Sequence, residues 1–381
     1  MSAPANGGRD PRRVALLIPT YPPEVSRGAE RVVGELARGL VARDCVPRVV
    51  TGSPGAAGGS TAIEDGFEVT RVRRAPERPL LARGFESHLT HLPWSYAALC
   101  SGDDALAHAH FHTDALAALR WARERDRPVV LSFHGLANRE TAAARRLRLA
   151  ILARALEGAD RVVVSSRAAA EAMERWFGVE ATPIHPGVRE EFFAARAERS
   201  ERPTIVCAAD PDDPRKRLAL LVGAFGEVRR SRSDAELLIV RPSRRDLAER
   251  YEATPGVRMF ERTAEPAALA SIYARSWVSA LASHSEAFGL VLAEALACGT
   301  PGVGASDGGV PELLGNDHDG GSQVGRLFER DDEAGLARAL AEALELAEDG
   351  ATAERCRERA GEFGVDRMCD AHLAIYRELT V

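Results

Sequence analysis

The stretch VSALASHSEAFGLVLAEALACGTPGVGAS, residues 278–306, contains a complete strand–helix–strand unit. Its first six residues are apolar or small, which is typical of a strand buried inside a parallel sheet. The loop HSEAF leads into an apolar helix with Gly289 near its first turn, and Gly299 and Pro301 mark its end. The strand-like run PGVGAS follows directly. Because neighbouring parallel strands need such a crossover, this stretch predicts an α/β fold.

The same alternation of strand and helix patterns extends along most of the chain. The first buried-strand pattern is RVALLIP (13–19), and a second series begins at TIVCAA (204–209). The polar, turn-rich segment 185–203 between the two series predicts a linker. Helical patterns near 333–348 and 353–378 end the chain. We therefore expect two similar α/β halves with a ligand cleft between them, at the carboxyl ends of the strands.

Composition limits the classes of function. The chain has 381 residues, 45% hydrophobic and 28% charged, as in a soluble protein of two domains. Its net charge of -6 predicts no general attraction to nucleic acid or anionic membranes. The six cysteines form no C-x-x-C pair, which favours a reducing compartment over a disulfide framework or a zinc site. No apolar run approaches the ~20 residues of a transmembrane helix, and residues 1–12 lack a signal-peptide core, so we expect a cytoplasmic protein.

The loop and helix after residue 283 combine an anion site with two carboxylates. The N–H groups of Phe288, Gly289 and Leu290 are expected at a helix N-terminus, where phosphate binds well. Glu286 and Glu294 are eight positions apart, ~80° about a helix axis, and so roughly on one side. Since carboxylates repel phosphate, sugar hydroxyls beside the phosphates are their natural partners. The alternative is an amphipathic helix with one solvated and one capping glutamate.

Several motifs resemble one enzyme family. The segment SEAFGLVLAEALACGTPGVGASDGGVPELL (285–314) resembles the donor-binding segment of the retaining glycosyltransferases of family 4 (GT4). RGAERVVGELARGL (27–40), VVLSFHG (129–135) and VRMFERTAEPAALASIYARS (257–276) are similar to other segments of that family. The resemblance extends along nearly the whole chain, and it implies the GT-B fold of two Rossmann-like domains with parallel sheets facing a central cleft.

The resemblance also implies a division of the chain. Residues 13–185 would form an N-terminal domain on the acceptor side, and residues 186–365 a C-terminal domain on the nucleotide-sugar donor side. Residues 366–381 would form a helix that packs back on the N-terminal domain.

The resemblance assigns roles to individual residues. It implies catalytic roles for His134 near the transferred sugar, Lys216 on the diphosphate and Glu286 on the sugar hydroxyls. Lys216 is the single lysine among 50 basic residues, and a flexible point charge suits a diphosphate oxygen. The donor-binding residues that it implies are Gly28, Ala29, Thr263, Ala287, Phe288, Gly289, Leu290 and Glu294, with Gly28 and Ala29 in a loop and Glu294 on the nucleotide ribose. Arg215 is added as a donor-binding candidate because it adjoins Lys216.

The chain departs from the family at one position. Relatives usually carry an arginine six positions before the lysine, where this chain has Asp210, and Arg215 is a candidate replacement. The DPD at 210–212 matches a D-x-D metal motif, but Pro211 and Pro214 favour a turn. We therefore predict no metal, and the absence of G-x-G-x-x-G disfavours a dinucleotide cofactor.

A group of alternating histidines also suggests metal at first sight. These residues are His108, His110 and His112, which could share one face of a strand. Their position resembles a strand-end histidine segment of the family, so we assign them no metal role.

Together these features predict a metal-independent glycosyltransferase that uses a nucleoside-diphosphate sugar as substrate and needs no cofactor. It would transfer a hexose-type sugar, with retention of configuration, to a hydroxyl of a small-molecule acceptor, which we expect to be a specialised metabolite. Lys216, Arg215 and helix N–H groups would stabilise the departing diphosphate. The alternatives are a GT-B sugar-nucleotide epimerase and a non-catalytic sugar-nucleotide binding protein. No nucleic-acid partner and no transmembrane segment are expected.

Overall fold

The protein is described by a computed structural model for residues 12–25, 27–54, 59–263, 265–315 and 323–380. The chain divides into two compact units. Unit 1 comprises Met1–Ser165, Ala169–Ile184 and Asp366–Val381, and unit 2 comprises Ser166–Ala168 and His185–Val365. Each unit holds one sheet of mostly parallel strands, which confirms the predicted α/β class.

Unit 1 is built on an eight-stranded sheet with the order β3-β4-β2-β1-β5-β6-β7-β8, in which β3 alone among the described pairings runs antiparallel to its neighbour. The runs at β1 and β5 are buried almost throughout, as continuous apolar strands are when both faces of a sheet are covered. The strands are β1 (Arg13–Ile18), β2 (Val46–Pro54), β3 (Ser60–Glu64), β4 (Phe67–Arg74), β5 (Leu106–Ala109), β6 (Val129–Phe133), β7 (Arg161–Val164) and β8 (Thr182–Pro183). The helices are α1 (Gly28–Val41), α2 (Arg78–Ala82), α3 (Leu92–Ser101), α4 (His112–Arg125), α5 (Arg139–Ala143), α6 (Arg148–Gly158), α7 (Arg167–Phe177) and α16 (Val365–Thr380). The first two residues of α7 and the first residue of α16 belong to unit 2.

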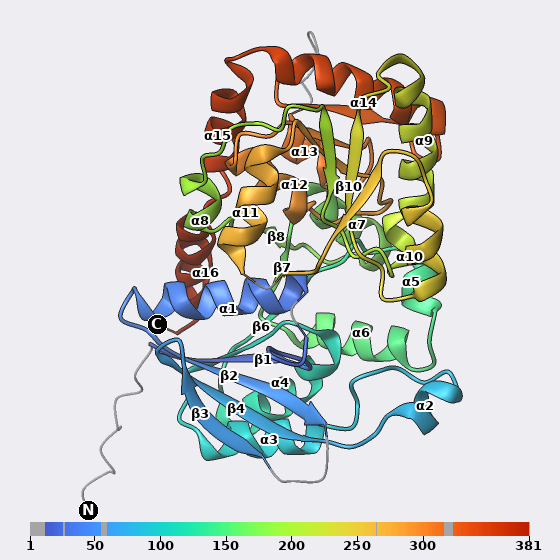
Figure 1. Ribbon diagram of the computed structural model, residues 1–381. Helices are drawn as coiled ribbons and strands as arrows, with labels where there is room; N and C mark the ends of the chain where they lie inside the picture. Colours follow the sequence, from blue (N-terminus) through green and yellow to red (C-terminus); the bar gives the residue numbers. More distant parts are fainter. Residues whose placement is uncertain (1–11, 26, 55–58, 264, 316–322, 381) are drawn as a thin grey trace, which may run out of the picture. The chain divides into compact units, whose positions relative to one another are not determined.

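Unit 2 is built on a six-stranded parallel sheet with the order β11-β10-β9-β12-β13-β14. Helices α9 and α14 pack together on one side of this sheet, and α11, α12 and α15 lie on the other side (Figure 1). The strands are β9 (Thr204–Cys207), β10 (Glu236–Val240), β11 (Val257–Phe260), β12 (Val278–Leu281), β13 (Gly302–Ala305) and β14 (Gly325–Phe328). The helices are α8 (Glu190–Ala194), the 3-10 turn η1 (Pro214–Lys216), α9 (Leu218–Ser231), α10 (Arg245–Glu252), α11 (Pro266–Arg275), α12 (Leu290–Ala297), α13 (Val310–Leu314), α14 (Glu333–Glu348) and α15 (Thr352–Gly361).

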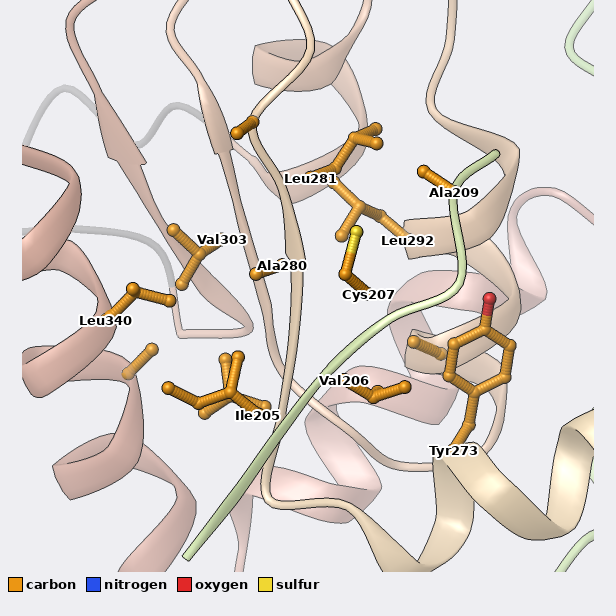
Figure 2. Packing of buried hydrophobic residues seen from close by; sticks show 14 of the residues in the cluster. Ile205, Val206, Cys207, Ala209, Tyr273, Ala280, Leu281, Leu292, Val303 and Leu340 are labelled. Atoms are coloured by element: carbon orange, nitrogen blue, oxygen red, sulfur yellow. The ribbon is translucent and has the colours of Figure 1, made fainter. Parts of the chain in front are cut away.

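The buried core of unit 2 holds the carboxyl ends of its strands in place, and polar loops begin at these ends. In the central strand β9, Ile205 points towards Leu340 of α14, whereas Val206 points towards Tyr273 of α11 (Figure 2). Successive side chains of a strand alternate in this way, so helices on both faces hold β9. All four of these side chains are 0% exposed. The carboxyl end of β9 is therefore a rigid starting point for the loop that follows it.

Two predictions about local structure were wrong. The expected helix at 353–378 is divided into α15 and α16, because the chain between them pairs with Val188. The Val188 N–H donates to the Phe363 carbonyl at 2.7 Å, and Phe363 is 3% exposed. The segment 185–203 is also more than a linker, since it contains α8 with Phe192 completely buried. A five-residue helix is too short to show helical periodicity.

Candidate functional site

The carboxyl ends of the parallel strands in unit 2 carry a close lysine–glutamate contact. Glu286 lies in the loop after β12, and its Oε2 accepts a hydrogen bond from Lys216 Nζ at 2.7 Å. The two side chains are 19% and 20% exposed, so ligands can reach the pair. Lys216 was predicted at the start of a helix, but it ends η1, and Arg217 with φ +50° separates it from α9. The lysine therefore sits on a tight turn in front of the helix.

The first turn of α12 offers free backbone donors beside this pair. Gly289 precedes the helix with φ +96°, a left-handed conformation that favours glycine. The N–H groups of Phe288, Gly289 and Leu290 have no hydrogen-bond acceptor among the residues that the structure describes. Donors at a helix N-terminus attract anions, because the helix dipole adds partial positive charge there. This loop thus places the Glu286 carboxylate and three N–H groups close to the ammonium group of Lys216.

The side chain of Phe288 anchors this loop in the protein. Phe288 is 2% exposed, and its ring lies 5.5 Å from that of His185 and 5.3 Å from that of Phe363, measured between centroids. His185 Nε2 in turn contacts Glu312 Oε1 at 2.7 Å, and the Arg167 N–H donates to Glu312 Oε2 at 2.8 Å. Burial alone would raise the pKa of Glu312, but these hydrogen bonds outweigh it and lower the pKa below its usual value. The backbone of Phe288, rather than its ring, is left for a ligand.

The two glycines after β13 allow one loop to lie directly on another. The Gly309 N–H donates to the Glu286 carbonyl at 2.9 Å. A Cβ atom would lie 2.2 Å from the Glu286 oxygen if added at Gly308, and 2.3 Å from the Ala287 oxygen if added at Gly309. Nearby, the Ser285 N–H donates to Asp307 Oδ2 at 3.1 Å. Gly308 and Gly309 therefore allow the loop after β13 to lie against the backbone of Glu286 and Ala287.

Arginines near the pair are arranged differently from the prediction. Arg215, the candidate replacement for the missing arginine, contacts Asp213 with Nη2 at 2.6 Å from Oδ2, and this hydrogen bond raises the pKa of Arg215. Asp210 is bonded instead to Arg262, whose Nη2 lies 2.9 Å from Asp210 Oδ1. Arg262 follows β11 and precedes Thr263, a predicted donor-binding residue whose Oγ1 accepts a hydrogen bond from a nearby backbone N–H at 3.0 Å. Sequence reasoning missed Arg262, because the pair joins loops of two strands that are distant in the chain.

The two glutamates do not share one helix. Glu286 precedes α12, which begins at Leu290, so the expected ~80° separation about a helix axis does not apply. The chain turns between them at Gly289, with φ +96°, and Ser285, directly before Glu286, has φ +54°. Glu294 lies within α12 and is 1% exposed, whereas Glu286 is accessible.

The remaining predicted residues belong to unit 1. Gly28 and Ala29 are the first two residues of α1 and not part of a loop, and a Cβ added at Gly28 would meet nothing within 4 Å. His134 follows β6 and is half-buried, and its Nε2 lies 3.1 Å from His110 Nδ1. Burial, followed by the field of His372, lowers the pKa of His134 to about 4. His134 is therefore neutral at pH 7.

The DPD segment forms a turn. The Asp213 N–H donates to the Asp210 carbonyl at 3.2 Å, and the Asp212 carboxylate accepts the Ser243 N–H at 3.0 Å. Within the described parts of the chain, no group of three or more histidine, cysteine, aspartate or glutamate side chains is placed to hold a metal ion. In the same parts, no helix is both long and apolar enough to cross a bilayer.

Two family models match consecutive parts of the chain. The model described as Glycosyltransferase Family 4 matches residues 26–192, and that described as Glycosyl transferases group 1 matches residues 188–363. A D-inositol 3-phosphate glycosyltransferase of Streptomyces scabiei is 28% identical, covering 98% of this chain and 94% of the relative. A phosphatidyl-myo-inositol mannosyltransferase of Propionibacterium freudenreichii subsp. shermanii is 28% identical over 58% of this chain and 56% of the relative.

Solved structures share the fold at low sequence identity. Sucrose-phosphate synthase from Thermosynechococcus elongatus superposes with a TM-score of 0.79 at 21% identity, covering 96% of this chain and 98% of that one. The Anabaena protein HepE in complex with UDP-glucose gives a TM-score of 0.74 at 16% identity, covering 96% of this chain and 99% of that one. These neighbours are GT-B proteins, so the predicted GT-B fold is confirmed.

The close approach of the two loops predicts a matched pair of glycine variants. Gly309→Ala places a methyl group against the Ala287 carbonyl, and such overpacking should lower the free energy of unfolding by about 1–3 kcal/mol. Gly226→Ala in α9 meets nothing within 4 Å and should raise it by roughly 0.5–1 kcal/mol. Urea denaturation of both variants checks this. Equal stabilities would show that the loops do not approach as described.

Proposed function

Because the chain belongs to the family 4 glycosyltransferases, we propose that it moves a hexose-type sugar from a nucleoside-diphosphate sugar to a hydroxyl of a small acceptor, with retention of configuration. The observation that carries this proposal is the Lys216–Glu286 bond of 2.7 Å beside the N–H groups of residues 288–290, which have no acceptor in the described part of the chain. The ammonium group of Lys216 and the N–H groups can donate hydrogen bonds to a diphosphate, and the Glu286 carboxylate can accept hydrogen bonds from sugar hydroxyls. The complex of a structural neighbour with UDP-glucose supports a nucleotide-sugar donor.

Lys216 would bridge the donor's diphosphate and Glu286. An ammonium group has three N–H donors, and only one is needed for the bond to Glu286. The others can reach phosphate oxygens, while the N–H groups at the start of α12 face the same charge. Lysine here also shields the diphosphate from the carboxylate of Glu286, since the two anionic groups would otherwise repel each other.

Glu286 would bind hydroxyls of the transferred sugar, and His134 would contact the same sugar from unit 1. When the bond between the anomeric carbon and the phosphate oxygen breaks, negative charge grows on the diphosphate. Lys216 and the α12 N–H groups would stabilise this charge. The acceptor oxygen would form the new bond on the same face of the sugar, and its proton would pass to an oxygen of the departing diphosphate.

Arg262 would supply the second cation for the diphosphate. Its guanidinium is held at 2.9 Å from Asp210 and is 54% exposed, so it can swing to a ligand. Arg215 is tied to Asp213 by its backbone N–H and by its side chain, at 3.0 and 2.6 Å. Gly28, Ala29 and Thr263 would line the donor site, and Glu294, with 1% exposure, would meet the nucleotide ribose with one edge of its carboxylate.

The acceptor would be a small polyhydroxylated molecule. The relatives named D-inositol 3-phosphate glycosyltransferase make that compound the first acceptor to assay. The test incubates the protein with UDP-, GDP- and ADP-hexoses, with and without D-inositol 3-phosphate and a panel of hydroxylated metabolites, and mass spectrometry follows the products. A glycoside with the donor's anomeric configuration supports the proposal. A new sugar nucleotide formed without acceptor would indicate an epimerase instead, and nucleotide binding without turnover would indicate a binding protein.

Lys216→Ala should lower turnover ~10²-fold or more, because it removes a cation that stabilises the transition state. Steady-state kinetics with the donor identified above checks this. Arg245→Ala is the matched control, since Arg245 is a 91% exposed cation of the same unit whose partner is Glu249. Turnover of Lys216→Ala within twofold of this control would refute the assignment of Lys216.

Variants of the Asp210–Arg262 pair should change phosphate binding in opposite directions. Arg262→Ala should weaken binding of the nucleoside diphosphate about tenfold, in line with loss of a charge-assisted hydrogen bond. Asp210→Asn should strengthen it, because Arg262 loses its competing carboxylate. Calorimetric titration checks both, and neither variant should change binding of the nucleoside without phosphates. An equal loss for nucleoside and diphosphate would place Arg262 away from the phosphates.

Activity should survive exhaustive treatment with EDTA, because Lys216, Arg262 and helix N–H groups meet the charge of the diphosphate. Turnover before and after chelation, with Mg²⁺ and Mn²⁺ added back, checks this. A complete loss that either ion restores would contradict metal independence and point to the DPD turn.

A further inference from the structure

Four histidines of unit 1, three of them buried and His134 half-buried, lie in one continuous group, of which the proposed function uses only His134. They are His108 in β5, His110 directly after β5, His134 directly after the neighbouring strand β6, and His372 in α16. The ring centroids of His108 and His110 are 4.0 Å apart, and those of His108 and His372 are 5.4 Å apart. His110 and His134 stack at 5.3 Å with an angle of 10° between their planes. Protonation of one ring would therefore make protonation of its neighbours less favourable.

The group is uncharged. Burial, followed by repulsion from the neighbouring rings, lowers the pKa of His108 and His110 far below its usual value. Burial also lowers the pKa of His372 to about 4, against a smaller effect of its bond to the Met368 carbonyl. The other polar groups that face these rings are Tyr376, whose hydroxyl is 2.6 Å from His108 Nδ1, and Ser132, whose Oγ is 2.8 Å from His108 Nε2.

Two other histidines of unit 1 have carboxylate partners. His91 contacts Asp114 at 2.9 Å, and His112 Nε2 lies 3.5 Å from Glu86. Among the described contacts, none of the four grouped rings meets a carboxylate. Each of the four is therefore a neutral imidazole with one N–H donor and one acceptor nitrogen.

The bond between His110 and His134 can be made in two ways. His110 Nδ1 and His134 Nε2 are 3.1 Å apart, so one of them carries the hydrogen and the other accepts it. If His134 donated, the proton of His110 would be on its Nε2. That atom is buried and has no hydrogen-bond partner among the residues that the structure describes. A buried N–H without an acceptor is costly and rare, so the proton of His110 belongs on Nδ1, from which it is donated to His134.

We propose that His110 is a positioning residue that fixes His134 as the neutral tautomer protonated on Nδ1. The only lone pair of His134 then accepts from His110, and the nitrogen turned away from His110 carries a proton. Relying on the proposed function for the contact between His134 and the sugar, this makes His134 a hydrogen-bond donor to substrate. It also excludes His134 as the base that receives the proton of the acceptor hydroxyl.

The tautomer can be observed without any substrate. In the full-length protein labelled with ¹⁵N-histidine, long-range ¹H–¹⁵N spectra distinguish protonated from unprotonated ring nitrogens, and loss of signals in His134→Asn assigns the ring. We expect His134 protonated on Nδ1 alone and unchanged between pH 6 and 8. Protonation on Nε2, titration in that range, or a metal-bound nitrogen would each overturn the proposal.

Variants of His110 separate positioning from mere packing. His110→Leu removes the donor and should convert His134 to a mixture of tautomers, with kcat lowered about threefold to tenfold, as for loss of one neutral hydrogen bond, and KM for the donor unchanged. His110→Asn places an amide N–H near the lost Nδ1–H and should restore both tautomer and kcat. His372→Asn is the control, since it keeps a donor for the Met368 carbonyl and touches no bond of His134. A tautomer that stays on Nδ1 in folded His110→Leu would overturn the role of His110.

The two proposals can fail separately. If the wild type shows the Nδ1 tautomer but transfers no sugar, the proposed function fails and the tautomer assignment stands. If it transfers sugar with His134 protonated on Nε2, the proposed function stands and this inference fails. Should His110→Leu not fold, the wild-type spectrum and His110→Asn still decide the matter.

Discussion

The hydrogen bond from the Gly309 N–H to the Glu286 carbonyl is the constraint on which the candidate site depends. It requires two backbones to lie closer than any Cβ atom permits, and Gly308 and Gly309 make this possible. With its carbonyl held, Glu286 directs its carboxylate to Lys216. Residues 288–290 then turn into α12, and their N–H groups have no acceptor among the residues that the structure describes. One backbone contact thus sets the positions of the charges and of the neutral donors together.

The core beneath the site keeps this arrangement rigid. Phe288 sits among aromatic rings on one side, and β9 and β12 are buried through the middle of the sheet. Polar side chains at the strand ends therefore keep their spacing while the ligand arrives. Preorganised charge of this kind stabilises a transition state better than groups that must move into place.

The fold class could be predicted from the sequence because buried strands and amphipathic helices leave periodic patterns. The resemblance to the family likewise indicated Glu286, Lys216 and Gly289. The detailed geometry could not be predicted, since residues such as Ser285 and Arg217 adopt positive φ values that no periodicity reveals. The Asp210–Arg262 pair was missed for another reason: it joins residues 52 positions apart, and local patterns contain no information about such pairs. The histidine group depends in the same way on α16, which follows β6 by more than 200 residues.

The membership of α16 in unit 1 has a consequence for biosynthesis. Unit 2 is almost continuous in the sequence, from His185 to Val365, whereas unit 1 needs Asp366–Val381 from the end of the chain. A ribosome delivers the polypeptide from its N-terminus, and domains fold as units when they are complete. The part of unit 1 that is translated first is therefore completed only by Asp366–Val381, which are translated after all of unit 2. Until Tyr376 is available to meet His108, the nascent unit 1 lacks the helix whose Met368, Leu373 and Ile375 are buried in the finished protein.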